Sequence, residues 1–159
     1  MRSLIASLAF ASLAAACSEA PSSKPSNKAW VMPSRSESVA LFESCNGAIL
    51  CYFPKSLEKI GDLNTGRKMG GGAVLRDIKA KGSQTIVRWD VPQDMTKDLD
   101  KYGFPIGKQG YEAYLKEHLK NNYCGDRNSR AYFAAGGQII LETYLPSGER
   151  FTRSVANSC

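Results

Sequence analysis

Hydrophobic and polar positions repeat with a helical period over residues 108–123. Apolar and aromatic side chains fall on one stripe of the predicted helix: Tyr111, Tyr114, Leu115, His118, Leu119 and Tyr123. The opposite side carries Lys116, Glu117, Lys120 and Asn121. This pattern predicts an amphipathic helix that packs one face on a core and leaves the other face in water.

A second helical segment is predicted further toward the N-terminus. Ser34-Arg35-Ser36-Glu37 has the spacing of a capping box, in which the hydroxyl and the carboxylate satisfy backbone amides reciprocally. Residues 39–45 can add two or three helical turns, and Asn46-Gly47 ends them. The apolar run 48–53 ends at Pro54, and residues 55–72 predict a short helical turn followed by a loop.

Two hairpins supply the predicted strands, because alternating runs rich in β-branched residues flank turn-forming residues. The first hairpin turns at Gly82-Ser83 and the second at Pro146-Ser147-Gly148. The four strands are predicted at residues 73–81, 85–91, 138–145 and 149–155.

The predicted elements follow one another as helix, hairpin, helix, hairpin. This order indicates an α+β domain, in which a small antiparallel sheet from two hairpins carries helices packed on one face. Both faces of strand 138–145 are partly apolar, since Ile139 and Leu141 alternate with Ile140 and Tyr144. We therefore expect a peptide partner to bind at an edge strand of the second hairpin or in the groove between sheet and helix.

The N-terminal residues have the pattern of an export signal. Arg2 precedes an apolar run of about 13 residues, which is shorter than the ~20 residues that span a bilayer. Residues 1–16 are therefore predicted to be a signal peptide. Ala14-Ala15-Ala16-Cys17 resembles the lipobox of bacterial lipoproteins, although Ala14 stands where Leu is commonest. The alternative is cleavage by the ordinary signal peptidase, which releases a soluble protein.

The segment after Cys17 suits a lipid-anchored protein. Residues 17–36 are rich in Ser and Pro and are predicted to form a flexible tether, followed by a single globular periplasmic domain at residues 37–159. Ser18 follows the cysteine, which in bacterial lipoproteins favours the outer membrane. We expect the protein at the bacterial outer membrane, anchored through its lipid and facing the periplasm. The alternative is a soluble periplasmic or secreted protein.

Composition and charge narrow the class of protein. The 159 residues are 43% hydrophobic and 23% charged, which suits one globular domain and excludes a collagen-like or fully disordered chain. The formal net charge of +6 comes from scattered basic residues. For an exported protein we expect no nucleic-acid partner. Lipid head groups, lipopolysaccharide, an acidic wall polymer or an acidic protein suit this charge better.

Five cysteines divide into one for the lipid and four for disulfides. With Cys17 acylated, the others form an even set that suits an oxidising compartment. Of the three possible connectivities we favour Cys45–Cys51 with Cys124–Cys159. The second bond would clamp the last strand to the main helix, and the Asn46-Gly47 break lets Cys45 and Cys51 approach each other.

No motif predicts catalysis, a metal or a cofactor. The chain has no Cys-x-x-Cys, and His118 falls on the apolar stripe of its helix, which is typical of a packed histidine. The stretch 66–72 is glycine-rich but lacks the Gly-Lys-Ser/Thr ending of a phosphate-binding loop. Acidic residues alternate with lysines in a pattern typical of a solvated surface: Asp94, Asp98 and Asp100, with Glu112 and Glu117 elsewhere. We expect a protein that is not an enzyme.

The C-terminal third resembles a known family of lipoproteins. A helix ends in Tyr123-Cys124-Gly125-Asp126, a hairpin follows with Gly148 in its turn and Phe151 after it, and the chain closes at Cys159. With the export signal and Cys17, this resembles the small disulfide-containing pilotin lipoproteins of type II secretion. The resemblance implies a secretin's short C-terminal segment as partner. It covers about 50 residues, and the front half has no counterpart in the family.

Together these features predict a lipid-anchored periplasmic binding or assembly-accessory protein, of which a pilotin-like chaperone of a secretion-system component is one form. Its expected partners are the membrane, through the lipid, and a protein or peptide. The alternative is an exported inhibitor or immunity protein against a toxin or lysozyme. Such proteins are also small, exported and disulfide-bonded.

Overall fold

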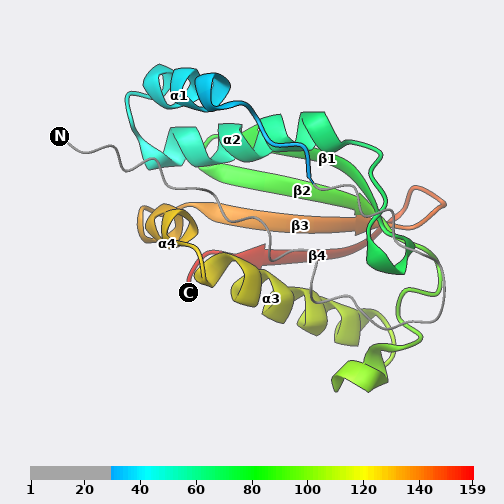
Figure 1. Ribbon diagram of the computed structural model, residues 1–159. Coiled ribbons are helices and arrows are strands. Elements are labelled where there is room, and N and C mark those ends of the chain that lie inside the picture. The colour runs from blue at the N-terminus through cyan, green and yellow to red at the C-terminus, as the bar shows by residue number, and fades with distance from the viewer. Residues whose placement is uncertain (1–29) are drawn as a thin grey trace.

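The structure, a computed structural model, describes residues 30–159, so the predicted signal peptide and Cys17 lie outside the described residues. Helices pack on a four-stranded sheet (Figure 1). The helices are α1 Arg35–Ser44, α2 Ile49–Asn64, α3 Lys108–Cys124 and α4 Arg127–Ala134. The strands are β1 Val74–Lys81, β2 Gln84–Asp90, β3 Gln138–Tyr144 and β4 Arg150–Ala156. The predicted α+β fold is confirmed.

The sheet joins two antiparallel hairpins through one parallel pair. Its strand order is β1-β2-β3-β4, in which β2 and β3 run parallel and pair Gln84 with Gln138 at one end and Asp90 with Tyr144 at the other. A parallel pair requires a crossover connection, and here α3 and α4 lie in it. The sheet is thus mostly antiparallel, and β1 and β4 are its two edges.

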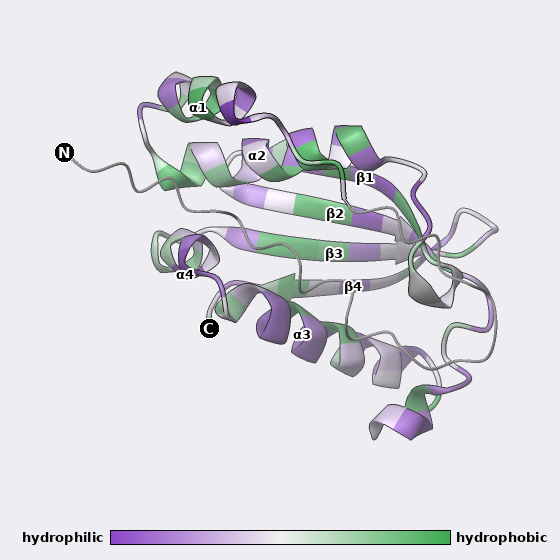
Figure 2. Cartoon of the chain, viewed as in Figure 1, coloured by the Kyte–Doolittle hydropathy of each residue, from purple (hydrophilic) through white to green (hydrophobic). Residues whose placement is uncertain are grey.

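The hydrophobic core lies between the sheet and its helices. Leu75, Val87, Ile139 and Leu141 from the strands meet the apolar faces of α2, α3 and α4. Figure 2 shows hydrophobic residues along the middle of β2 and β3 and mostly hydrophilic residues along α3. The predicted stripe of α3 is confirmed, because Tyr111, Leu115 and Leu119 are buried.

The capping box predicted at the start of α1 is confirmed. Ser34 Oγ accepts a hydrogen bond from the Glu37 N–H, and the Ser34 N–H donates to Glu37 Oε2 at 2.8 Å. Hydrogen bonds from the Ser34 backbone and side chain, followed by the nearby Lys59 ammonium, lower the pKa of Glu37 to about 2. None of the residues of α1 is buried, so this helix lies on the outside of the domain.

Helix α2 corrects the expectation that Pro54 ends the apolar run at residue 53. The helix continues to Asn64 with Pro54 inside it. Proline removes one backbone hydrogen bond from a helix, yet Phe53, Leu57 and Ile60 carry a single buried stripe across this position. Burial of that stripe against β1 outweighs the missing bond, and the predicted loop over residues 55–72 begins only after the helix ends.

Among the described residues, contacts with the core extend back to Trp30, ahead of residue 37, the predicted start of the domain. The Val31 N–H donates to Asn64 Oδ1 at 3.0 Å, and Asn64 Nδ2 donates to the Val31 carbonyl at 2.8 Å. Trp30 packs edge-on against Trp89, with 6.4 Å between ring centroids. The buried Asn64 thus ties the chain ahead of α1 to the end of α2.

Candidate functional site

A groove of about 450 Å³ lies between α3 and the end of β4. Helix α3 contributes one exposed stripe at helical spacing, opposite its buried stripe: Ala113, Lys116, Glu117 and Lys120. Val155, Ala156 and the residues up to Cys159 line the other side, and Phe104 lies in the lining as well. The groove therefore combines apolar side chains with two lysines and one carboxylate.

Two contacts hold the walls of this groove together. Ser154 Oγ on β4 lies 3.5 Å from the Glu112 carbonyl of α3. Beyond the strand, the Cys124–Cys159 disulfide joins the C-terminal ends of α3 and the chain, with 5.5 Å between the two Cα atoms. Helix and strand lie side by side and end near the same point (Figure 1). These two contacts hold α3 beside the edge strand β4.

An aromatic cluster adjoins the groove at Phe104. The Phe104 ring meets Tyr114 edge-on at 5.6 Å, and Tyr114 in turn stacks on His118 at 5.7 Å. Tyr102 and Ile106, in the loop before α3, are 52% and 63% exposed. The groove therefore continues into apolar surface that is open to a partner.

Electrostatics favour an acidic partner at this groove. Within residues 30–159, neither Lys116 nor Lys120 takes part in an ion pair. Both side chains are exposed, and Glu117 is the acidic residue in the groove lining. A ligand carboxylate placed here would gain a charge-assisted hydrogen bond without breaking an existing ion pair of the described chain.

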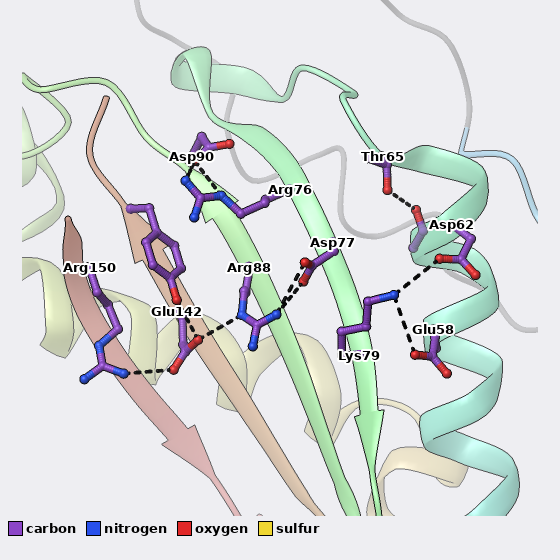
Figure 3. Close-up of polar contacts among 12 residues, drawn as sticks. Glu58, Asp62, Thr65, Arg76, Asp77, Lys79, Arg88, Asp90, Glu142 and Arg150 are labelled. Carbon is purple, nitrogen blue, oxygen red and sulfur yellow. Dashed lines mark hydrogen bonds and ion pairs between the residues drawn. The ribbon is translucent and has the colours of Figure 1, made fainter. Parts of the chain in front are cut away.

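The sheet face that points away from the helices carries a network around Glu142. Arg88 Nε donates to Glu142 Oε2 at 3.1 Å, and Arg150 Nη1 donates to Oε1 at 3.2 Å (Figure 3). Tyr144 also donates to this carboxylate, and Arg88 bridges across to Asp77. Burial alone would raise the pKa of Glu142, but its hydrogen bonds and the arginine charges outweigh that effect and lower it.

A second, smaller groove of about 360 Å³ lies between α1 and α2. Ala40 and Leu41 from α1 and Ser56 and Lys59 from α2 are in its lining. Lys59 Nζ pairs with Glu37 at 3.1 Å, so the cation of this groove already has a partner. The lining of this groove comes from helices α1 and α2 and from Pro33, and includes no strand.

The four cysteines of the described chain form two disulfides, Cys45–Cys51 and Cys124–Cys159. This is the connectivity that the sequence analysis favours. Cys17, the predicted lipidation site, lies outside the described residues. Cys159 lines the groove and is bonded to Cys124 at the end of α3, while the Cys45–Cys51 bond lies at the junction of α1 and α2.

The remaining candidates from the sequence are structural or lie on the surface. His118 is half-buried, and burial lowers its pKa. Asp94 and Asp98 form exposed ion pairs with Lys97 and Lys101. In the glycine-rich stretch, Arg67 lies over the Trp30 ring at 5.6 Å and donates to Asn64 Oδ1 at 3.3 Å.

Residues 30–159 contain neither a cluster of potential metal ligands nor a helix suited to span a membrane. No three His, Cys, Asp or Glu side chains there are grouped so that they could hold a metal ion. No helix in that part of the chain is long and apolar enough to cross a membrane.

Comparisons with known proteins give structural similarity only. The chain matches no family model, and no curated protein has a matching sequence. A presumed secreted protein from Pseudomonas aeruginosa is similar in structure, with a TM-score of 0.50 and 11% identity, over 79% of this chain and 96% of that chain. At this identity the likeness shows a shared fold and nothing about activity.

Two pilotins were also found among solved structures. The Vibrio vulnificus type 2 secretion system pilotin EpsS has a TM-score of 0.44 at 11% identity, covering 78% of this chain and 94% of that one. The Vibrio cholerae type II secretion system pilotin AspS has a TM-score of 0.37 at 13% identity, covering 69% and 95%.

Proposed function

We propose that this protein is a lipid-anchored periplasmic binding protein that holds a short segment of a partner protein in the α3–β4 groove. The observation that carries the proposal is the groove itself, which has apolar walls and two lysines with no ion-pair partner among residues 30–159. A half-buried aromatic cluster adjoins it, next to the exposed Tyr102. Such a combination of apolar contact and a few placed charges suits recognition of a peptide segment. We propose that the protein acts by binding and assembly, not by catalysis.

A pilotin-like role is the form of this function that we favour. It rests on the sequence resemblance around Cys124, Gly148, Phe151 and Cys159, which implies the C-terminal segment of a secretin as the partner. Three of these residues lie close to the groove or its walls. Cys159 lines the groove, Cys124 ends α3, and Phe151 stacks on Tyr111 of α3 at 5.8 Å. These three residues thus lie in or beside the elements that form the groove.

The groove is tested by one substitution and its matched control. Ala113→Arg places a long side chain in the α3–β4 groove, and Ala40→Arg makes the same change in the groove between α1 and α2. Binding of a peptide with the C-terminal sequence of the host bacterium's secretin is measured by isothermal titration calorimetry. We expect Ala113→Arg to weaken binding at least tenfold and Ala40→Arg to leave it unchanged.

Both variants add the same positive charge, so a difference between them reports position and not charge. Equal binding by Ala113→Arg and the unchanged protein would contradict the groove assignment. A protein that does not bind the secretin segment at all would contradict the pilotin-like role and favour the inhibitor or immunity protein. Circular dichroism of both variants shows whether the fold is retained.

Lipid anchoring through Cys17 is a separate part of the proposal. It is supported by the disulfides, because Cys45, Cys51, Cys124 and Cys159 pair with one another and leave Cys17 as the one cysteine outside these bonds. We expect the intact mass of the protein from a bacterial membrane fraction to show an acylated Cys17 and no thiol that alkylates. An unlipidated mass with one reactive thiol would instead indicate a soluble exported protein.

A further inference from the structure

The two edges of the sheet differ in how their backbone groups are satisfied. At the start of β1, the Leu75 N–H donates to the Arg67 carbonyl at 2.9 Å, and the Leu75 carbonyl accepts from the Gly66 N–H at 2.8 Å. Strand β4 pairs with β3 on one side, and within residues 30–159 its other side has no backbone partner. An open edge strand is a template for pairing with another chain.

The open edge of β4 lies beside the groove, so one ligand can use both. Side chains of an added strand alternate between the two faces of the sheet. On the helix-covered face they would enter the groove beside Lys116 and Lys120. On the other face they would meet Arg150 and Arg153, which pair with Glu142 but remain 55% and 46% exposed.

Resting on the proposed function, we propose that β4 binds the partner segment as a fifth strand, and that the segment carries acidic side chains at alternate positions. The cations are Lys116 and Lys120 in the groove lining, with Arg150 and Arg153 on the other face. The carboxylates of the groove lining and of those arginine ion pairs are Glu117 and Glu142. A second copy of this chain fits less well, because two β4 strands would bring Arg150 and Arg153 of both copies together. The charge therefore favours an acidic partner over self-association.

The spacing of the two lysines supports this geometry. Residues four apart in a helix are about 6 Å apart along its axis. Side chains on one face of a strand recur about every 6.7 Å. A strand that runs alongside α3 can therefore place two successive acidic side chains of one face next to Lys116 and Lys120 at the same time. Helix α3 runs beside β4, so a strand paired with β4 also runs alongside α3.

The test uses a designed probe, an end-blocked seven-residue peptide that alternates Val and Glu, with Lys replacing Glu in the control peptide. Binding to the 15N-labelled protein is followed by NMR at pH 7, together with hydrogen exchange of the β4 amides. We expect the acidic peptide to bind at least tenfold more tightly than the basic one and to slow exchange of amides in residues 150–156. Alternate amides of a bound strand point toward β4. N-methylation of that set should abolish binding, whereas N-methylation of the other set should not.

Charge reversal supplies the matched variants. Lys116→Glu with Lys120→Glu should reverse the preference between the two peptides, whereas Lys79→Glu with Lys81→Glu, on the opposite edge strand β1, should leave it unchanged. Absence of binding, equal affinity for both peptides, or unchanged β4 exchange overturns strand addition. If the secretin segment still binds and Ala113→Arg still weakens it, the proposed function stands without this mode of binding.

Discussion

Replacing Cys124 and Cys159 together by Ser is expected to lower the free energy of unfolding by about 4 kcal/mol. The two cysteines are 35 positions apart, and their bond restricts a long loop of the unfolded chain. The bond also holds the tail beyond β4 against the end of α3, where a free terminus would fray. Urea unfolding of the oxidised protein and of the double variant measures the difference.

The second disulfide provides the control for this prediction. Cys45 and Cys51 are six positions apart, so the same chain-entropy argument gives only about 2 kcal/mol for their removal. The expected order of stability is therefore the unchanged protein, then Cys45→Ser with Cys51→Ser, then Cys124→Ser with Cys159→Ser. An equal loss in both double variants would show that loop length does not govern the effect. No loss of stability in Cys124→Ser with Cys159→Ser would show that the C-terminal disulfide does not stabilise the fold.

Tyr132→Ala is the second change with a large expected effect, a loss of about 3–5 kcal/mol. Tyr132 of α4 is fully buried, and its ring stacks on Phe53 of α2 with centroids 4.4 Å apart. Its hydroxyl lies 2.6 Å from the Ser83 carbonyl and 2.9 Å from the Gln138 carbonyl. This single side chain thus links two helices to the junction of the two hairpins.

Tyr132→Phe separates the ring from the hydroxyl. It keeps the stack on Phe53 and removes the donor, so we expect a smaller loss of about 1–2 kcal/mol. Both variants are compared by thermal and urea unfolding. If Tyr132→Phe lowers the free energy of unfolding as much as Tyr132→Ala, the hydroxyl dominates and the packing argument is wrong. If Tyr132→Ala lowers it by less than about 1 kcal/mol, Tyr132 does not join the hairpins as described.

Gly137 shows how closely the chain packs around this tyrosine. A Cβ atom at position 137 would lie 2.3 Å from the Tyr132 ring, far inside normal contact. This close approach of the Gly137 backbone to Tyr132 lets β3 begin at Gln138, next to α4. It explains why a glycine stands at this point between α4 and β3.

The strands and the main helix could be predicted from the sequence because their local patterns agree with their environment. Strand β2 alternates Val87 and Trp89 with Ile86 and Arg88. Val87 is buried in the core, and Trp89 is partly buried against it. The apolar stripe of helix α3 packs on the hydrophobic face of the sheet. In both elements a single face meets the core, so periodicity alone identifies it.

Other features depend on contacts between distant residues and could not be read from local pattern. The length of α2 depends on burial against β1, which overrides the proline. Helix α4 has only eight residues, and its one local signal is the Asp126 cap, whose carboxylate accepts from the Ser129 N–H at 2.8 Å. The parallel pairing of β2 with β3 joins residues 54 positions apart, and no local turn motif indicates it.

The location of the candidate site could be predicted from the sequence, but the residues that form it could not. The sequence indicates an edge strand of the second hairpin or the groove between sheet and helix, and both of these lie at β4 and α3. Lys116 and Lys120 appear in the sequence only as solvent-facing positions of a helix. Their proposed contact with an acidic partner depends on the edge of β4, which lies beside α3 only in the folded, disulfide-bonded chain.

The most direct test of the account is site-specific photo-crosslinking of the full chain in its own bacterium. A photo-reactive amino acid is placed at Ala113 or Asn157 in the α3–β4 groove, and at Ala40 in the groove between α1 and α2 as the control. The account predicts a crosslinked product with the secretin from Ala113 and Asn157 and none from Ala40. Products from Ala40 alone, or none from either position in the α3–β4 groove, would contradict it.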